Sequence, residues 1–120
     1  MQYMLLIHAD ENAYAQMPPE AQQQGYAAYM SYMEALKQAG VYIASGRLRP
    51  TSSTSRVHIV NGKAQVLDGP FVETKEQLGG YFLIDAADLD AALAWAARCP
   101  GASHGTVEVR PLWIMEPQAN

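Results

Sequence analysis

Side chains that could transfer protons are concentrated in the polar segment DGPFVETKEQLGG, residues 68–80. Asp68, Glu73, Lys75 and Glu76 place three carboxylates and an ammonium group close together in this segment. Carboxylates beside an ammonium group in a partly apolar cleft can serve as acid and base, so we take Asp68, Glu73 and Lys75 as candidate catalytic residues. The alternatives are an ordinary turn at the Asp-Gly-Pro sequence and a solvated loop for the charges that follow it.

His8 is a fourth candidate catalytic residue, because it ends a predicted strand over residues 2–8. From the end of that strand it could face the segment 68–80. An imidazole exchanges protons near neutral pH, which suits a general base. The alternative is a histidine that only bonds backbone at the strand end. His58 and His104 are predicted to lie on the surface.

Three further residues are candidate substrate ligands. Arg47 and Arg110 carry guanidinium forks, whose geometry suits a substrate carboxylate. Phe71 offers an aromatic ring within the polar segment. The alternatives are surface ion pairs for the two arginines and a core contact for Phe71.

No resident metal or cofactor is expected. The three histidines do not stand at metal-ligand spacing, and the single Cys99 excludes a cysteine-rich zinc site. Oxygen-only binding of Mg²⁺ by Asp68, Glu73 and Glu76 is the alternative. The LGGYF sequence precedes a predicted strand rather than a helix, so it is not a phosphate-binding loop. Cys99 ends a predicted helix, where the dipole disfavours a thiolate nucleophile.

The composition is that of one small acidic domain spanning residues 1–120. With 49% hydrophobic and 17% charged residues, the chain is neither disordered nor a coiled coil. The net charge of -4 argues against a nucleic-acid partner, whose affinity comes mainly from a basic surface. The N-terminal MQYMLLIHADEN has no basic region and too short an apolar run for a signal peptide or a membrane span. We therefore expect a cytoplasmic protein with no membrane partner.

Hydrophobic patterning predicts the elements that must position the candidate residues. Strands are expected at residues 2–8, 41–45, 81–85 and 106–110, and a hairpin at 56–60 and 63–67 around Asn61-Gly62. Residues 8–20 are polar and contain prolines, which indicates a loop.

Two helices are predicted, one over residues 19–39 and one that begins after Asp88 and ends at Pro100-Gly101. Their expected core faces are Tyr26, Tyr29, Met30, Met33 and Leu36 in the first helix, and Leu89, Ala92, Leu93 and Ala96 in the second. Gly40 is expected to end the first helix, and Gly46 to end the strand that follows.

The order β-α-β, hairpin, β-α-β predicts an α+β fold, a ferredoxin-like split βαβ layout with an inserted β-hairpin. The strands at residues 2–8 and 81–85 are apolar on both sides. Two helices can cover only one face of their sheet, so the other face needs a different cover. A second copy packed sheet to sheet would supply it, and we expect a homodimer.

The segment DGPFVETKEQLGGYFLID, followed by DLDAALAWAARCPG and GTVEVRPL, closely resembles the DGPF branch of the YCII-related family. The sequences YMLLI and AGVYIASGRL fit as well, so the resemblance covers nearly the whole chain. It implies a ferredoxin-like fold that assembles as a dimeric α/β barrel. Some members of this family act on ring-derived or chlorinated small organic molecules, and DGPF genes often lie beside genes for extracytoplasmic-function sigma factors.

The chain departs from the family pattern at two positions. Many YCII proteins have a histidine in the first helix and an aspartate before the proline that ends the second. Here the helix at residues 19–39 contains no histidine, and Cys99 precedes Pro100. Neither residue of that pair carries over, so any chemistry must use other groups.

Two functional hypotheses remain open. One is a cofactor-independent enzyme that transfers protons on a small, ring-derived organic substrate, using His8 and a carboxylate of the 68–80 segment. The other is a non-enzymatic module that binds a ligand or regulates, linked to extracytoplasmic-function sigma-factor signalling. A small-molecule ligand is expected under both hypotheses.

Overall fold

The computed structural model describes residues 1–69 and 74–115. Its strands are β1 (Gln2–Ala9), β2 (Tyr42–Arg47), β3 (Ser55–Val60), β4 (Lys63–Asp68), β5 (Gln77–Asp85) and β6 (Thr106–Pro111). Its helices are α1 (Glu11–Ala15), α2 (Pro19–Gln38) and α3 (Leu89–Arg98), with 3₁₀ turns at Thr51–Ser53 and Pro100–Ser103.

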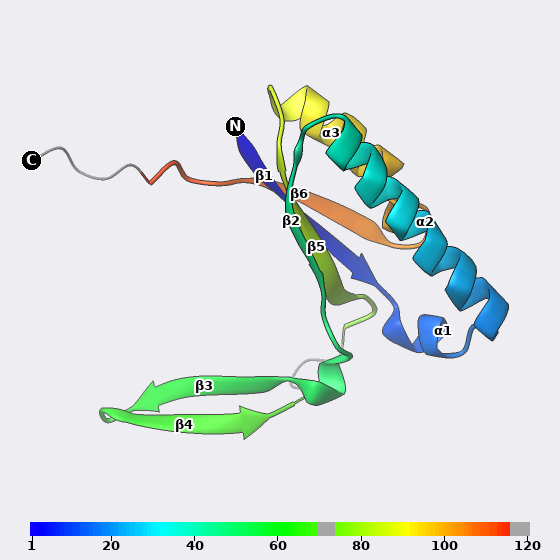
Figure 1. Cartoon of the computed structure of the whole chain (residues 1–120). Helices are drawn as coiled ribbons and strands as arrows, with labels where there is room; N and C mark the ends of the chain where they lie inside the picture. The colour runs from blue at the N-terminus through cyan, green and yellow to red at the C-terminus, as the bar shows by residue number, and fades with distance from the viewer. Residues whose placement is uncertain (70–73, 116–120) are drawn as a thin grey trace, which may run out of the picture.

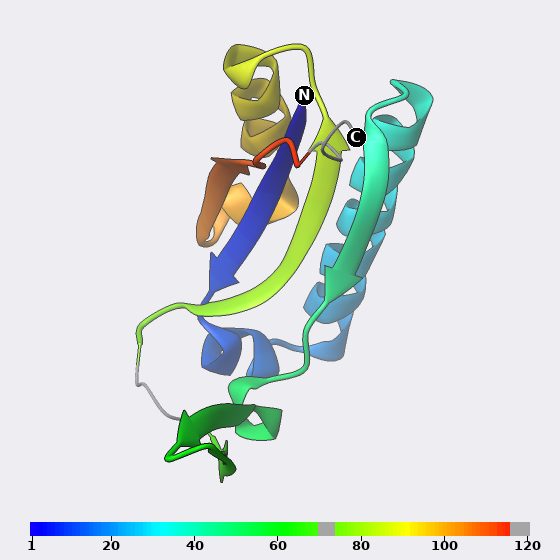
Figure 2. The same cartoon turned by 90° about the vertical axis from the view of Figure 1, so that its left-hand side faces the viewer.

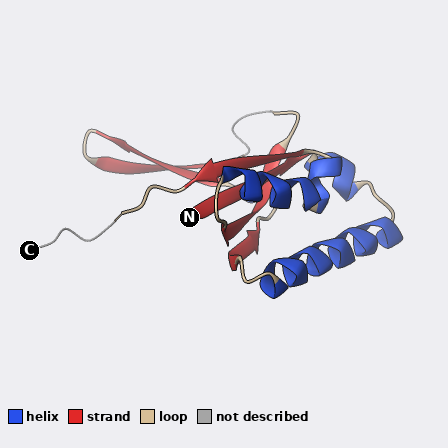
Figure 3. Ribbon diagram, turned by 90° about the horizontal axis from the view of Figure 1, so that it is seen from above, coloured by secondary structure: helices blue, strands red, loops and turns tan. Residues whose placement is uncertain are grey.

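Four strands form one antiparallel sheet in the order β2-β5-β1-β6. This order, with α2 and α3 as the crossover helices, is the ferredoxin-like arrangement, and it confirms the predicted fold class. β1 pairs with β5 on one side and with β6 on the other, so His8 lies between Leu78 and Thr106. Both helices cover the same face of the sheet (Figures 1 and 3).

The helix-covered face holds the core. Tyr3, Leu5 and Ile7 of β1 alternate with residues that are only half-buried on the opposite face. The same alternation places Phe82 and Ile84 of β5 in the core. These side chains pack against α2 and α3 and form one continuous cluster.

Helix α2 begins and ends as predicted, but its buried face is rotated. Pro19 is its first residue, and Gly40 at φ +72° follows its C-terminus. The expectation that Tyr26 and Met30 face the core is wrong, because they are 61% and 45% exposed. Tyr32 is buried instead. Its ring lies edge-on to Phe82, and its hydroxyl donates to the Trp95 carbonyl of α3 at 2.7 Å.

Helix α3 begins at the predicted cap, since the Asp88 side chain accepts a hydrogen bond from the Ala91 amide at 2.9 Å. Only half of its expected core face is buried. Ala92 and Ala96 lie in the core, whereas Leu89 and Leu93 are about half exposed at 49% and 46%. The helix turns its small residues toward the sheet, which allows a close approach.

The prediction of a loop over residues 8–20 is wrong, because it contains helix α1. Asp10 is the N-cap, and its carboxylate accepts from the amides of Asn12 and Ala13. This cap stabilises a helix of one turn that has no buried residue, so hydrophobic periodicity could not reveal it.

The opposite face of the sheet is not covered by any element of the described chain (Figures 1 and 3). We call it the open face. It carries Met4 and Leu6 of β1 beside Tyr81 and Leu83 of β5, as the strand pairing shows. The predicted end of β2 at Gly46 is wrong, because the strand continues to Arg47. Gly46 leaves room for the Tyr81 ring, since a Cβ there would lie 2.8 Å from Tyr81 Cε1.

Strands β3 and β4 form a separate two-stranded sheet, which confirms the inserted hairpin. Its turn residues Asn61 and Gly62 have φ of 51° and 76°, as a two-residue hairpin turn of this type requires. The hairpin projects from one end of the sheet toward the side of the open face (Figures 1 and 2). Within the described residues, no helix is both long and apolar enough to cross a membrane.

Candidate functional site

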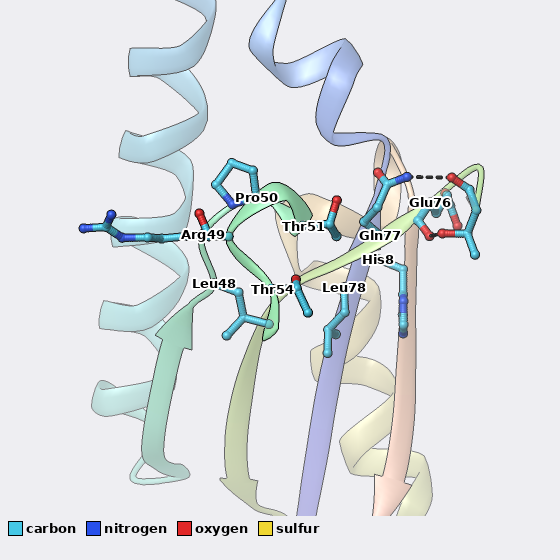
Figure 4. A pocket seen from close by; sticks show the side chains of 11 residues that line it. His8, Leu48, Arg49, Pro50, Thr51, Thr54, Glu76, Gln77 and Leu78 are labelled. Atoms are coloured by element: carbon cyan, nitrogen blue, oxygen red, sulfur yellow. Dashed lines mark hydrogen bonds between the residues drawn. The ribbon is translucent and has the colours of Figure 1, made fainter. Parts of the chain in front are cut away.

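A cavity of about 630 Å³ lies where the hairpin joins the main sheet. Its volume falls within the range typical of small-molecule sites. The end of β1, the segment after β2 and the start of β5 all contribute to its wall (Figure 4). The lining residues are His8, Leu48, Arg49, Pro50, Thr51, Ser53, Thr54, Thr74, Glu76, Gln77 and Leu78.

His8 is the imidazole of this cavity. It lies on the open-face side of β1, directly beyond an irregularity of the β1–β5 pairing between Ile7 and His8. The side chains of His8, Leu78, Thr54 and Leu48 project in the same direction (Figure 4). Among the described residues, the His8 ring has no hydrogen-bond or ion-pair partner.

Glu76 supplies the carboxylate of the cavity. Its Oε1 accepts a hydrogen bond from the Thr106 hydroxyl at 2.9 Å. Thr106 is directly opposite His8 in the antiparallel pair of β6 and β1. Side chains of such pairs lie on one face with Cβ atoms about 5 Å apart, so this bond holds the Glu76 carboxylate on the His8 side of the sheet.

Gln77 fixes the start of β5 at the cavity rim. Its Nε2 donates to the Thr74 carbonyl at 2.6 Å (Figure 4). Its Oε1 accepts from the Glu11 amide at 2.9 Å. One amide side chain thus joins the segment before β5 to the first residue of α1.

The opposite rim is tied to α1 by Glu11. Its carboxylate accepts from the Thr51 amide at 3.1 Å and from the Thr51 hydroxyl. Arg49 lies in the same rim, but its side chain points away from the other cavity residues (Figure 4). The groups facing the cavity are consequently hydroxyls, an amide, an imidazole and a carboxylate, with apolar surface from Leu48 and Leu78.

The structure brings only part of the predicted site together. His8 lines the cavity, and Thr74 and Glu76 on either side of Lys75 do so as well. Lys75 itself is exposed. Asp68 ends β4, and its carboxylate accepts from the Ser55 hydroxyl across the hairpin at 2.9 Å. Glu73 lies outside the described residues.

The predicted substrate ligands are placed apart from one another. The Arg47 guanidinium lies 5.0 Å from the ring centroid of Tyr14, in a cation–π contact at the end of β2. Arg110 is opposite Met4 on the open face and is exposed. Phe71 lies outside the described residues. The roles of these residues, and of Asp68, Glu73 and Lys75, stay predictions.

Sequence reasoning missed Thr51 and Gln77 and did not select Glu76 as a catalytic residue. Glu76 belongs to the polar segment, and its hydrogen bond to Thr106 holds it on the His8 side of the sheet, because Thr106 pairs with His8. The local sequence does not show this pairing of β6 with β1. The Glu11–Thr51 tie spans forty positions in the chain, and no local pattern signals it. The segment after Arg47 gave no periodic signal either, because the chain leaves the sheet there.

A second group of titratable side chains lies in the core rather than at the cavity. Cys99 is the C-cap of α3 and is buried, and burial raises the pKa of its thiol. Burial also raises the pKa of the Tyr29 and Tyr32 hydroxyls, with a further increase from the nearby Cys99. These shifts favour neutral, unreactive side chains at neutral pH.

Across residues 1–69 and 74–115, no three His, Cys, Asp or Glu side chains gather as a metal site requires.

The sequence profile of the YCII-related domain matches residues 1–116. This chain belongs to the YCII-related family. An uncharacterised protein of Rhizobium meliloti (strain 1021) is 36% identical to this YCII-related protein over 119 residues, which are 98% of the chain and 96% of the relative.

The solved structures include a related fold. The 5-chloro-2-hydroxyhydroquinone dehydrochlorinase of Burkholderia phenoliruptrix AC1100, determined with 2,5-dihydroxybenzoquinone, superposes with a TM-score of 0.54. The match covers 94% of each chain at 14% sequence identity. At this identity the likeness shows that the two proteins share the ferredoxin-like fold.

Proposed function

We propose that this YCII-related protein binds a small hydroxylated ring compound in the cavity at His8 and transfers a proton on it. The observation that carries the proposal is an imidazole that has no partner among residues 1–69 and 74–115, in the same cavity as a carboxylate and several hydroxyls. Such a set of convergent polar groups on an otherwise apolar wall is typical of small-molecule sites.

The cavity chemistry favours a ligand with hydroxyl or carbonyl groups over a strongly anionic one. The Thr54 hydroxyl can donate to or accept from ring substituents, and the Thr51 oxygen can accept beside its bond to Glu11. Leu48 and Leu78 offer apolar surface for the ring. Arg49 lines the cavity, but its side chain points away from the other lining side chains, which are mostly uncharged (Figure 4). A hydroxylated aromatic or quinone ring satisfies both conditions.

In the proposed reaction step, His8 accepts the proton of a ring hydroxyl or of an activated ring carbon. The resulting imidazolium is stabilised by the Glu76 carboxylate, which Thr106 holds on the same side of the sheet. Positioned general bases of this kind contribute typically 10²–10⁴-fold to a rate. The dehydrochlorinase with the same fold was determined with a hydroxylated quinone, and this supports the choice of substrate class.

We further propose that the protein is a homodimer whose open faces pack against each other. Met4, Leu6, Tyr81 and Leu83 line a face that no described helix covers. Antiparallel sheets with two apolar faces are normally covered on both, and a second copy is the simplest cover.

Calorimetric titration with 2,5-dihydroxybenzoquinone tests the binding step. We expect saturable binding that His8→Asn weakens by about tenfold, the loss of roughly one hydrogen bond to a charged or polarised group. His104→Asn, in an exposed loop, is the matched control and should bind as the parent protein does. Equal affinity of His8→Asn and the parent protein would refute a site at His8.

Exchange of ring protons in D₂O, followed by NMR with hydroquinone-type compounds, separates an enzyme from a binding module. An enzyme accelerates the exchange, and His8→Asn lowers the acceleration by about 10²-fold or more. Binding without acceleration would instead favour the alternative hypothesis of a ligand-binding or regulatory module linked to extracytoplasmic-function sigma factors.

A further inference from the structure

The hairpin β3–β4 has one face whose centre is apolar and one face of mixed polarity. The pairing places Val57 opposite Val66 and Ile59 opposite Ala64, so these four side chains share a face. On the other face His58 is opposite Gln65, flanked by the pairs Arg56–Leu67 and Val60–Lys63. Val57, Ile59 and Val66 are 67%, 62% and 64% exposed. An amphipathic ribbon of this kind is the pattern of a strand pair that packs on a hydrophobic surface.

Nothing in the described chain supplies that surface. Every residue of β3 and β4 except Val60 is exposed, and the hairpin forms a sheet of its own. A two-stranded ribbon alone in water is marginally stable at best. The Asn61-Gly62 turn and the regular strand register nevertheless define the hairpin. Its exposed apolar side chains indicate that it packs against another surface.

The direction of the hairpin identifies the surface. It extends away from the sheet on the side of the open face, and the segment Leu112–Met115 leaves the other end of the sheet on the same side (Figures 1 and 2). Trp113 and Met115 in that segment are 90% and 88% exposed. A molecule that covers the open face therefore lies between two exposed apolar segments.

The length of the hairpin exceeds the thickness of a sheet-to-sheet contact. Six residues per strand at about 3.3 Å each reach about 20 Å, whereas packed sheets lie about 10 Å apart. A hairpin that starts at one end of the sheet and extends outward on the open-face side is long enough to pass beside the sheet of a second copy and lie along its flank (Figures 1 and 2).

We propose that the hairpin β3–β4 is a dimerisation arm, whose Val57–Ile59–Val66 face packs on a second copy of this chain. This inference rests on the face-to-face dimer proposed above. Because Thr51, Ser53 and Thr54 at the base of the arm also line the cavity, the arm places the cavity at the border of the two subunits. Each subunit gives an arm and receives one, as twofold symmetry requires.

The test measures the dimer dissociation constant of the full chain by sedimentation, with variants on the two faces of the hairpin. The arm variant V57T/I59T/V66T keeps β-branched side chains and adds hydroxyls to the apolar face. The control variant H58T/Q65T changes the other face of the same strands. We expect the arm variant to raise the dissociation constant by about 100-fold or more, and the control to change it by less than about threefold.

Amide hydrogen exchange of the hairpin gives a second readout that does not depend on the folding of the arm variant. In the dimer the β3 and β4 amides should be protected, and Leu83→Glu on the open face should abolish both the dimer and this protection. An intact dimer with unprotected hairpin amides, or with the same dissociation constant in the arm variant, overturns the arm and leaves the dimer standing. A parent chain that stays monomeric at all concentrations overturns the dimer itself, and the arm with it.

Discussion

The Thr51 amide donates a hydrogen bond to the Glu11 carboxylate at 3.1 Å, and this contact fixes one rim of the cavity on helix α1. The same helix is joined to the opposite rim, because the Glu11 amide donates to the Gln77 side chain. One residue thus connects the segment before the hairpin with the start of β5. The cavity depends on this short helix for its shape.

Glu11→Ala should loosen the rim. The substitution removes the acceptor of both Thr51 hydrogen bonds. Loss of a buried hydrogen bond to a charged group lowers the free energy of unfolding by about 1.5–3 kcal/mol. The loss is smaller at this partly exposed site, because solvent screens the charge. We expect a loss of about 1 kcal/mol in urea denaturation and weaker binding of 2,5-dihydroxybenzoquinone. Glu20→Ala, an exposed residue in the first turn of α2, is the control for removing a carboxylate near a helix N-terminus. Unchanged ligand affinity in Glu11→Ala would show that α1 does not shape the site.

Gly46→Ala should destabilise the protein and perturb the open face. Its Cβ would lie 2.8 Å from Tyr81 Cε1, so the ring must move off the sheet. Overpacking of this kind typically lowers the free energy of unfolding by about 1–3 kcal/mol. Gly25→Ala is the matched control, because a Cβ there meets nothing within 4 Å in helix α2, and it should raise stability by about 0.5–1 kcal/mol. Equal stability of the two variants would contradict the packing of Tyr81 over Gly46.

Stability should fall with rising pH in the alkaline range. Burial raises the pKa of Tyr29, Tyr32 and Cys99 in the folded chain above the values of about 10 and 8.5 in the unfolded chain. Between the unfolded and folded pKa values the unfolded state binds fewer protons, so the free energy of unfolding decreases as pH rises. The midpoint of urea denaturation should therefore fall steadily from about pH 8.5 upward. Tyr29→Phe should flatten this slope, whereas Tyr26→Phe, an exposed residue on the same helix, should leave it unchanged.

Light scattering of the purified chain should give a mass of about 26 kDa, twice the 13.1 kDa of one chain. The apolar side chains of the open face are the reason for this expectation. Leu6→Glu places a charge in the centre of the proposed interface and should yield a monomer. A well-folded parent monomer at micromolar concentration would refute sheet-to-sheet packing.

Much of the fold could be predicted from the sequence because its signals are local. Asn61-Gly62 defines the hairpin, Asp88 caps α3, and the strands at β1 and β5 are apolar on both sides. The face of α2 could not be predicted in full, because the helix carries apolar residues on two overlapping stripes. Only tertiary contact with Phe82 and Trp95 selects Tyr32 over Met30.

The candidate site could be predicted only where a strand end defined it. His8 was accessible to sequence reasoning because it ends a strand of clear periodicity. The side-chain direction of Arg47 could not be predicted, since the alternation of faces stops where β2 ends. Arg47 lies over the Tyr14 ring, and Arg49, which follows β2, lies at the cavity rim. The contact of Thr51 with Glu11 joins two irregular segments and requires the folded chain.

An NMR titration of the three histidine side chains with 2,5-dihydroxybenzoquinone shows directly whether the cavity at His8 binds a ring compound. The chain contains His8 at the cavity, His58 on the hairpin and His104 in an exposed loop, so two histidines are internal controls. We predict that the ring resonances of His8 shift in a saturable manner and that those of His58 and His104 stay in place. Equal shifts of all three rings, or no shift of His8 at a concentration that saturates binding, would contradict a small-molecule site at His8.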